Sequence, residues 1–240
     1  MNRDSNTYTF LFAAIMVFVV ATGLALAATG LKDRQDDNIR KEKMQNILAT
    51  IGVEVDREEA EVKYKEYIKE EITLRQGGVV DETVNAFGVE LNKELKKPLE
   101  EQYFPLYVAE IDGTTYYIVP LRGAGLWNAI WGYISLKDDI NTVKGVSFDH
   151  QAETPGLGAE ITQSWFKKRF EEEKILDESG EFVGISVVKG YSGGNDKSDN
   201  AVDAISGATI TGDGVTDMIA ERLQHYLPYL KKQKSQVALK

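Results

Sequence analysis

The segment DAISGATIT, residues 203–211, has the clearest potential for chemistry in the chain. Ser206, Thr209 and Thr211 place three hydroxyl groups within six residues, and an apolar pattern with helical spacing follows. The first turn of a helix offers free N–H groups and a partial positive charge, which suit a phosphate. A threonine hydroxyl is a weak nucleophile without a base, and no His or Cys lies nearby in the sequence. The segment indicates either ordinary turn chemistry or a phosphate site, and a covalent phosphate would be installed by another enzyme.

The composition restricts the other kinds of function. The net charge of −10 argues against nucleic-acid binding, which needs an excess of Lys and Arg. The chain has no cysteine, which excludes disulfides, thiolate nucleophiles and cysteine-ligated clusters. Its two histidines, His150 and His225, are far apart in the sequence, so a zinc site would need mostly carboxylate ligands, which is uncommon. A bound cofactor is therefore the better agent for any chemistry.

An uncharged apolar run occupies residues 8–31, after a short tail at residues 1–7. As a helix it is long enough to cross a hydrocarbon core of about 30 Å. The alternative is a cleaved signal peptide, because Ala25-Leu26-Ala27 resembles a cleavage site. The run is longer than the roughly 7–15 apolar residues of such peptides, which favours a membrane anchor. The flanking charges do not decide the side of the membrane, since long domains translocate largely regardless of charge.

Residues 32–100 combine dense charge with apolar residues at helical spacing, which predicts a helical stalk and the start of a soluble domain. The apolar residues with this spacing are Ile39, Met44, Ile47, Leu48 and Ile51, then Tyr64, Tyr67, Ile68 and Ile72. Residues 101–232 form the predicted domain proper, and residues 233–240 form a C-terminal tail.

The domain is predicted to be α+β, with antiparallel strands and flanking helices. β-Branched and aromatic residues flank Asp112-Gly113, which is a strong hairpin signal. A second strand pair is expected at residues 132–136 and 143–148, and another strand at residues 182–188. One helix is expected over Ile161, Trp165, Phe166 and Phe170. A single closing helix is expected to carry an apolar stripe that ends near Pro228; the stripe is Val215, Met218, Ile219, Leu223, Tyr226, Leu227 and Leu230.

The SGAT sequence at residues 206–209, preceded by Asp203, resembles the D-x-x-S/T-G-A-T motif of the FMN-binding domain family. The resemblance implies that FMN is attached to Thr209 through a phosphoester bond. It also implies a dedicated flavin transferase that uses FAD and reads Asp203, Ser206, Gly207 and Ala208. By this register Thr211 is free to cap the following helix through its hydroxyl.

Two further segments support the resemblance. The segment ETPGLG at residues 153–158 resembles the loop that lines the flavin, and GLW at residues 125–127, followed by Gly132, is similar to a signature within the family. Trp127 or Trp131 is suited to cover a flat ring. The flavin-contacting residues that the resemblance implies are Leu126, Trp127, Glu153, Thr154, Gly156, Leu157, Gly158 and Lys189.

The family resemblance implies an electron-transfer subunit that is not catalytic alone. It places the chain in a membrane-bound Na+-translocating NADH:quinone oxidoreductase, where electrons enter the covalent FMN and leave to a neighbouring subunit. The implied partners are the other subunits, the flavin transferase and the membrane. The soluble domain is expected on the periplasmic side of a bacterial inner membrane. The alternatives are the flavin-carrying G subunit of an Rnf complex and a non-redox, membrane-tethered binding protein.

Overall fold

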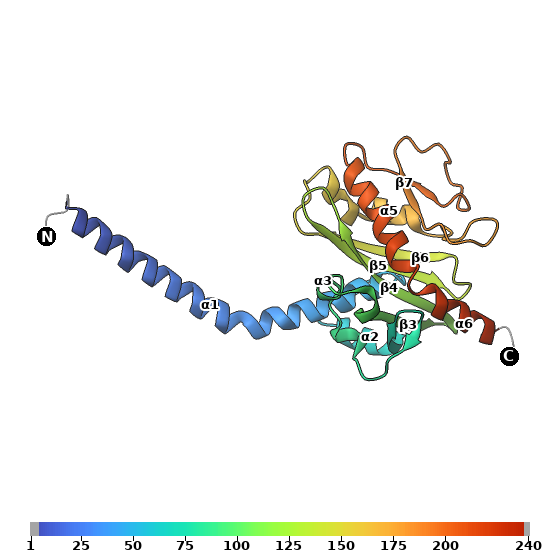
Figure 1. Ribbon diagram of the computed structural model, residues 1–240, viewed down its shortest axis with the longest axis horizontal. Coiled ribbons are helices and arrows are strands. Elements are labelled where there is room, and N and C mark those ends of the chain that lie inside the picture. Colours follow the sequence, from blue (N-terminus) through green and yellow to red (C-terminus); the bar gives the residue numbers. More distant parts are fainter. Residues whose placement is uncertain (1–4, 238–240) are drawn as a thin grey trace. The chain divides into compact units, whose positions relative to one another are not determined.

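The computed structural model describes residues 5–237, in two compact units whose boundary lies between Lys43 and Met44. The helices are α1 (Asn6–Ala49), α2 (Ala60–Tyr67), α3 (Leu91–Glu94), α4 (Ser164–Lys167), α5 (Thr209–Leu223) and α6 (Leu227–Val237) (Figure 1). The strands are β1 (Ile68–Arg75), β2 (Val79–Val80), β3 (Phe104–Ile111), β4 (Thr114–Ala124), β5 (Ala129–Lys137), β6 (Val143–His150), β7 (Ser186–Val188) and β8 (Ala201–Asp203). Short 3-10 helices occupy Ala86–Gly88, Leu99–Glu101, Gly158–Thr162 and Lys168–Phe170.

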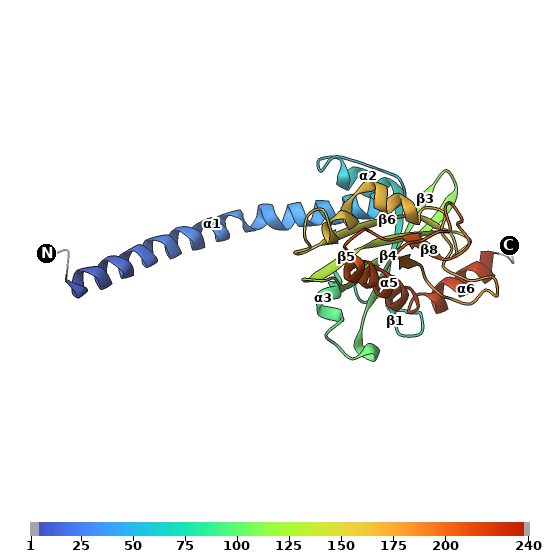
Figure 2. The same cartoon turned by 90° about the horizontal axis from the view of Figure 1, so that it is seen from above.

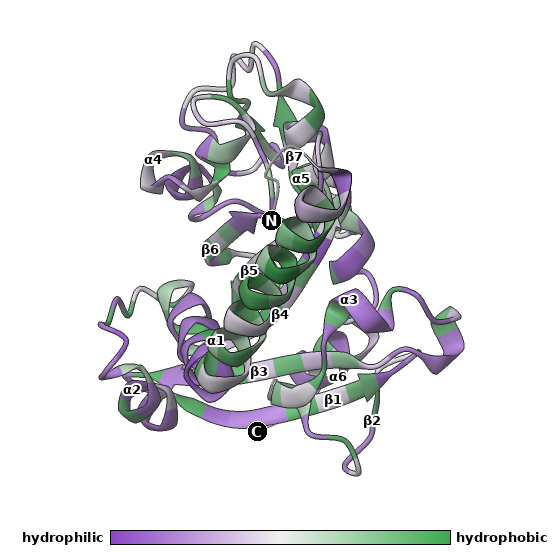
Figure 3. Cartoon of the chain, turned by 90° about the vertical axis from the view of Figure 1, so that its left-hand side faces the viewer, coloured by the Kyte–Doolittle hydropathy of each residue, from purple (hydrophilic) through white to green (hydrophobic). Residues whose placement is uncertain are grey.

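The first part of α1 contains the apolar run of residues 8–31 and is coloured mostly hydrophobic in Figure 3. The helix is long and apolar enough to cross a membrane, and none of its most apolar stretch is buried within the protein. A helix that is apolar all round and unburied suits a lipid environment. The helix does not end with this run but continues to Ala49.

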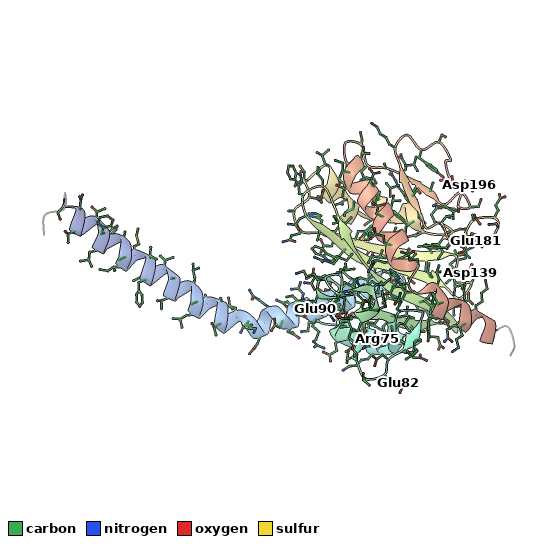
Figure 4. All side chains as sticks on the ribbon, in the orientation of Figure 1. Arg75, Glu82, Glu90, Asp139, Glu181 and Asp196 are labelled. Carbon is green, nitrogen blue, oxygen red and sulfur yellow. The ribbon has the colours of Figure 1, made fainter. Side chains whose placement is uncertain are left out.

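The second unit is built on an antiparallel sheet with the strand order β2-β1-β3-β4-β5-β6. Both hairpins predicted from the sequence are present, as β3–β4 and β5–β6. In the first turn, Asp112 and Gly113 both have positive φ angles, of 50° and 78°, as a tight hairpin turn requires. The second turn contains Asp139, which is labelled in Figure 4. Its Oδ1 accepts hydrogen bonds from the backbone N–H groups of Asn141 and Thr142.

Both faces of this sheet are covered. Because successive side chains of a strand point to opposite faces, Ile118 and Val119 of β4 belong to different cores. The core around Ile118 contains residues from the end of α1 and from α2, and the core around Val119 contains the apolar side of α5. Residues 44–100 therefore contribute a large part of the compact second unit.

Strands β4 and β5 extend beyond their neighbour β3, and β6 stays paired with β5 along this extension; the extended part of β4 and β5 is called the arm. The pairing of β3 with β4 reaches only to Ile118, whereas β4 stays paired with β5 as far as Ala124. The arm ends in the loop of residues 125–128, and α5 packs against β4 and β5 (Figure 2). The short parallel pair β7–β8 also contacts the helix, through β7. The arm, α5 and β7 thus converge on one region.

Two helix predictions were wrong in part. Tyr64 and Tyr67 lie in α2 as expected, but Ile68 and Ile72 lie in β1. The closing segment is two helices, α5 and α6, separated at residues 224–226. Pro228 is the second residue of α6 rather than the end of a helix. Proline clashes with the carbonyl group of residue i−4 and is tolerated only in the first turn of a helix. The break between the two helices therefore falls just before Pro228.

Two further element predictions were too long. The expected helix over residues 161–170 is a series of short helical turns, in which Ile161, Phe166 and Phe170 are buried and Trp165 is exposed. Gln163 has an extended backbone that interrupts the series. The expected strand at residues 182–188 is regular only at Ser186–Val188. The antiparallel sheet with flanking helices still confirms the α+β class.

Candidate functional site

One cavity, of about 230 Å³, gathers residues from all the segments that the sequence singles out. It lies where the loop of the β4–β5 arm, the loop that follows β6, the residue after β7 and the start of α5 meet. Its lining consists of Leu126, Glu153, Thr154, Leu157, Gly158, Lys189, Gly207, Ala208, Thr209, Ile210 and Thr211. Trp127, Gly156, Asp203 and Ser206, the other predicted site residues, are not among the described residues that line it.

The hydroxyl groups of the SGAT segment have different environments. Thr209 is exposed and lines the cavity. Ser206 is also exposed, but it lies outside the described lining. Thr211 is only 1% exposed, and its Oγ1 donates a hydrogen bond to Glu153 Oε2 at 2.6 Å. Of these three residues, Thr209 is therefore the one that is both exposed and part of the cavity lining.

The helix α5 begins at Thr209, with Ala208 as its N-cap residue. Ala208 makes no side-chain cap bond and Thr211, the third residue of the helix, donates its hydroxyl to Glu153, so the prediction that Thr211 caps the helix was wrong. Gly207 has a φ of 78°, a left-handed conformation that favours glycine, and it turns the chain into the helix. The first N–H groups of α5 are left without intrahelical acceptors at the cavity, as at any helix start.

The loop that follows β6 is held by short hydrogen bonds. Thr154 Oγ1 accepts from Trp127 Nε1 at 3.2 Å, and the Gly156 N–H donates to Glu160 Oε1 at 3.0 Å. The second bond means that the Gly156 N–H is already used within the loop. Apolar side chains remain exposed at the cavity, with Leu126 46% and Leu157 40% exposed. The site therefore combines a hydrogen-bonded loop with exposed apolar side chains.

The two tryptophans of the arm differ in position. Trp127 is 66% exposed on the loop next to the cavity, so its side chain is not a core residue. Trp131 lies within β5, where the guanidinium of Arg122 sits 5.6 Å from its ring centre. Of these two rings, only that of Trp127 is exposed near the cavity.

Glu153 is the buried charged group of the site, with 4% of its surface exposed. Its Oε1 accepts a hydrogen bond from the backbone N–H of Trp127 at 3.0 Å, and its own backbone N–H donates to His150 Nδ1. Burial raises the pKa of this carboxyl, but hydrogen bonds from Thr211 and from the backbone of Trp127 and Asn128 outweigh burial and hold the pKa below its usual value. An ionised carboxylate is therefore fixed in the wall.

Lys189 follows β7 and lines the cavity near the start of α5. Its side chain is exposed, and within residues 5–237 no carboxylate forms an ion pair with it. Asp203 instead ends β8, where its carbonyl oxygen accepts from Arg169 Nη1 at 2.6 Å. Asp203 lines a separate surface cavity together with Arg169. Arg169, which fixes the start of the DAISGATIT segment, carries no signal in the sequence.

The arrangement suits an anionic group attached to an aromatic one. The start of α5 and the ammonium of Lys189 attract an anion, and Leu126, Leu157 and Ile210 offer apolar contact. Ile210 was not identified from the sequence, because an isolated apolar residue at a helix start resembles any core position. Among the described residues, no cluster of three or more His, Cys, Asp or Glu side chains is suited to a metal ion.

Comparisons with known proteins agree with this arrangement. Residues 125–224 match the model of the FMN-binding domain family. The chain is 30% identical to the C subunit of the Na(+)-translocating NADH-quinone reductase of Haemophilus ducreyi, over 89% of this chain and 88% of that protein. It is 29% identical to the corresponding C subunit of Pseudomonas aeruginosa, over 91% of each chain.

A solved structure shows the same fold. The crystal structure of the C subunit of the Na(+)-translocating NADH-quinone reductase from Parabacteroides distasonis is 43% identical in sequence, with a TM-score of 0.76. The match covers 83% of this chain and 96% of that one. With these similarities over most of its length, and with an FMN-binding domain at residues 125–224, the chain belongs to the family of C subunits of Na(+)-translocating NADH-quinone reductases.

Proposed function

We propose that this chain is the membrane-anchored electron-transfer subunit of a Na+-translocating NADH:quinone reductase, and that its FMN is bound covalently to Thr209. The observation that carries the covalent assignment is the difference between the hydroxyl groups. Thr209 is exposed at the cavity, whereas the Thr211 hydroxyl is buried and bonded to Glu153. The membership of the chain in the C-subunit family favours this function over an Rnf subunit and over a non-redox binding protein.

The residues of the cavity fit the parts of FMN. A phosphate on Thr209 would be held at the start of α5, where free N–H groups and Lys189 favour negative charge. The apolar side chains of Leu126 and Leu157 face the cavity and suit the edge of a flat ring. The cavity is smaller than the roughly 300–1,000 Å³ of enclosed ligand pockets. The cavity would therefore hold only part of the group.

The bound flavin supplies the electron chemistry, and the protein supplies position, electrostatics and cover. Thr209 would anchor the group, Lys189 would neutralise phosphate charge, and Leu126 and Leu157 would exclude water from one part of the ring. The buried carboxylate of Glu153 adds a fixed negative charge to the wall. Trp127, on the exposed loop beside the cavity, would offer an aromatic contact to the ring.

Attachment is expected to need a second enzyme, because the one carboxylate among the described lining residues, Glu153, accepts from Thr211 rather than from Thr209. The transferase forms the bond between Thr209 Oγ1 and the flavin phosphorus of FAD. In the same step the pyrophosphate P–O–P link breaks and AMP leaves. Of the residues proposed to be read by the transferase, Ser206 and Gly207 are exposed and Ala208 is buried. The other proposed partners are the A, B, D, E and F subunits of the reductase, and the proposed location of the soluble domain is the periplasm.

Denaturing electrophoresis with in-gel flavin fluorescence tests the proposal. The full chain is coexpressed with a flavin transferase, alongside Thr209→Val, which keeps the shape of threonine but removes the oxygen. Wild-type protein is expected to fluoresce after denaturation, and Thr209→Val is expected to be dark. A fluorescent Thr209→Val band would move the bond to another residue, and a dark wild-type band would reject covalent attachment.

A further inference from the structure

The carboxylate of Glu153 joins segments that are far apart in the sequence. Oε1 accepts from the Trp127 N–H in the loop of the β4–β5 arm, and Oε2 accepts from Thr211 Oγ1 in the first turn of α5. Glu153 itself stands at the start of the loop of residues 153–158, next to His150, whose Nδ1 accepts from the Glu153 N–H. The Glu153 side chain therefore links the loop of residues 153–158, to which it belongs, to both the loop of the arm and the first turn of α5.

The glycines of the two loop motifs make room for this carboxylate. A Cβ atom on Gly125 would lie 2.5 Å from Glu153 Oε1. A Cβ atom on Gly158 would lie 2.2 Å from Glu153 Oε2 and 2.6 Å from Thr211 Oγ1. A Cβ atom at either position would displace the carboxylate from the place in which it accepts these hydrogen bonds. Gly125 of GLW and Gly158 of TPGLG thus have a common physical reason.

The chemistry of the contacts calls for a carboxylate. The neighbours of both oxygens are donors, namely the Thr211 hydroxyl and the N–H groups of Trp127 and Asn128. An ionised carboxylate only accepts hydrogen bonds, whereas the glutamine amide would bring an NH2 group to one of these positions. That NH2 group would face another donor at Oε1, or force the Thr211 hydroxyl to turn at Oε2. The isosteric amide is therefore a poor replacement.

We propose that Glu153 is a positioning residue that sets the geometry of the flavin site by clasping the arm loop to the start of α5. It acts through its partners: Thr211 is two residues beyond Thr209, and Trp127 follows Leu126. Fixing Thr211 fixes the turn that presents the Thr209 hydroxyl, and fixing the Trp127 N–H fixes the loop that presents Leu126. The proposal rests on the proposed function for its consequence, but its structural part can be measured without flavin.

The first experiment uses the full chain in detergent micelles, expressed without the transferase and labelled with 5-fluorotryptophan. The chain has three tryptophans, and Trp127→Phe assigns the signal of Trp127 in the ¹⁹F spectrum. Glu153→Gln and Thr211→Val are expected to shift or broaden that signal. Thr211→Ser, which restores the hydroxyl, is expected to return it to the wild-type position.

Thr216→Val is a matched control on the same helix. The Thr216 hydroxyl accepts from the Val187 N–H at 2.9 Å and donates to the Gly212 carbonyl, so its loss weakens α5 without touching the clasp. The Trp127 signal is expected to stay unchanged in this variant. A general loosening of the fold would move the signal in Thr216→Val as well, and that result would overturn the proposal.

The second measurement is the initial rate of flavin transfer from FAD to the same proteins by purified transferase. Glu153→Gln and Thr211→Val are expected to react about tenfold to a hundredfold more slowly, the equivalent of a hydrogen bond to a charged group. Wild-type rates or an unmoved Trp127 signal in Thr211→Val would overturn the proposal, even if Glu153→Gln fails to fold. If the wild-type chain failed to accept flavin while the ¹⁹F signal of Trp127 still shifted in Thr211→Val, the proposed function would be rejected. The role of Glu153 in positioning the two segments would still be supported.

Discussion

The close approach of α5 to β4 makes Gly214→Ala a sharp test of how the site is built. Gly214 lies in the interior of α5, where alanine is ordinarily more stable than glycine by about 1 kcal/mol. In this structure, however, a Cβ atom at Gly214 would lie 2.1 Å from the carbonyl oxygen of Ala124. That oxygen belongs to the backbone of the arm and cannot turn away, so α5 and β4 must move apart.

The expected cost follows from these two terms. Overpacking a tight contact costs about 1–3 kcal/mol, and the 2.1 Å contact with backbone belongs at the upper end. After subtraction of the helix-propensity gain, we expect Gly214→Ala to lose about 2 kcal/mol of unfolding free energy. For a domain of this size that corresponds to a drop of roughly 4–8 °C in Tm. The displaced helix also carries Thr209, so flavin attachment is expected to slow.

Gly212→Ala is the matched control in the same helix. Its Cβ atom would lie 3.1 Å from Val187 Cγ1, a side-chain atom that can shift by a few tenths of an ångström. The propensity gain and this small repacking cost nearly cancel, so its stability is expected within about 1 kcal/mol of wild type. Urea unfolding of the full chain in detergent, followed by tryptophan fluorescence, compares the two. If Gly214→Ala proved as stable as wild type, the tight contact between α5 and the arm would be refuted.

Three further predictions concern charge, cover and topology. Burial raises the pKa of Glu173, whose Oε1 lies 2.8 Å from Lys197 Nζ. Because this pKa is higher in the folded than in the unfolded protein, the folded protein loses stability as the pH rises through it. Lys197→Met removes the counterion of Glu173. The free energy of unfolding that this variant loses relative to wild type is expected to grow from pH 5 to pH 8, to about 1–3 kcal/mol given the partial exposure of Lys197. A loss that shrinks with rising pH would contradict this. Trp127→Ala is expected to change the fluorescence or potential of attached flavin while costing less than about 1 kcal/mol of stability, because the indole is exposed; an unchanged spectrum would separate Trp127 from the ring. In intact cells with a permeabilised outer membrane, added protease is expected to digest the soluble domain, and protection until the inner membrane is breached would reverse the proposed orientation.

The sequence predicted the features that depend on local chemistry. Asp112-Gly113 marks its hairpin because few residue pairs adopt consecutive positive φ angles at low cost. The choice of Thr209 comes from the motif register and stays a prediction, to which the structure adds that the Thr211 hydroxyl is buried and bonded to Glu153. The helical assignment of Ile68 and Ile72 was wrong because a spacing of four residues also fits one face of a strand.

Features that depend on contacts between distant segments carried no signal. The bond from Thr211 to Glu153 joins residues 58 positions apart, and the bond from Arg169 to the Asp203 carbonyl joins residues 34 positions apart. Neither pairing follows from periodicity or from a turn rule. The glycines at positions 125 and 158 were visible as motif residues, but the shared carboxylate that requires them became apparent only in three dimensions.

The covalent attachment of FMN to Thr209 is tested most directly by peptide mass spectrometry. The full chain is coexpressed with a flavin transferase and digested, and the fragment that contains residues 203–211 is sequenced by tandem mass spectrometry. The account predicts that this fragment carries the mass of FMN, less the water lost on ester formation, on Thr209. FMN located on Ser206 or Thr211, or an unmodified fragment from protein that is yellow after denaturation, would contradict it.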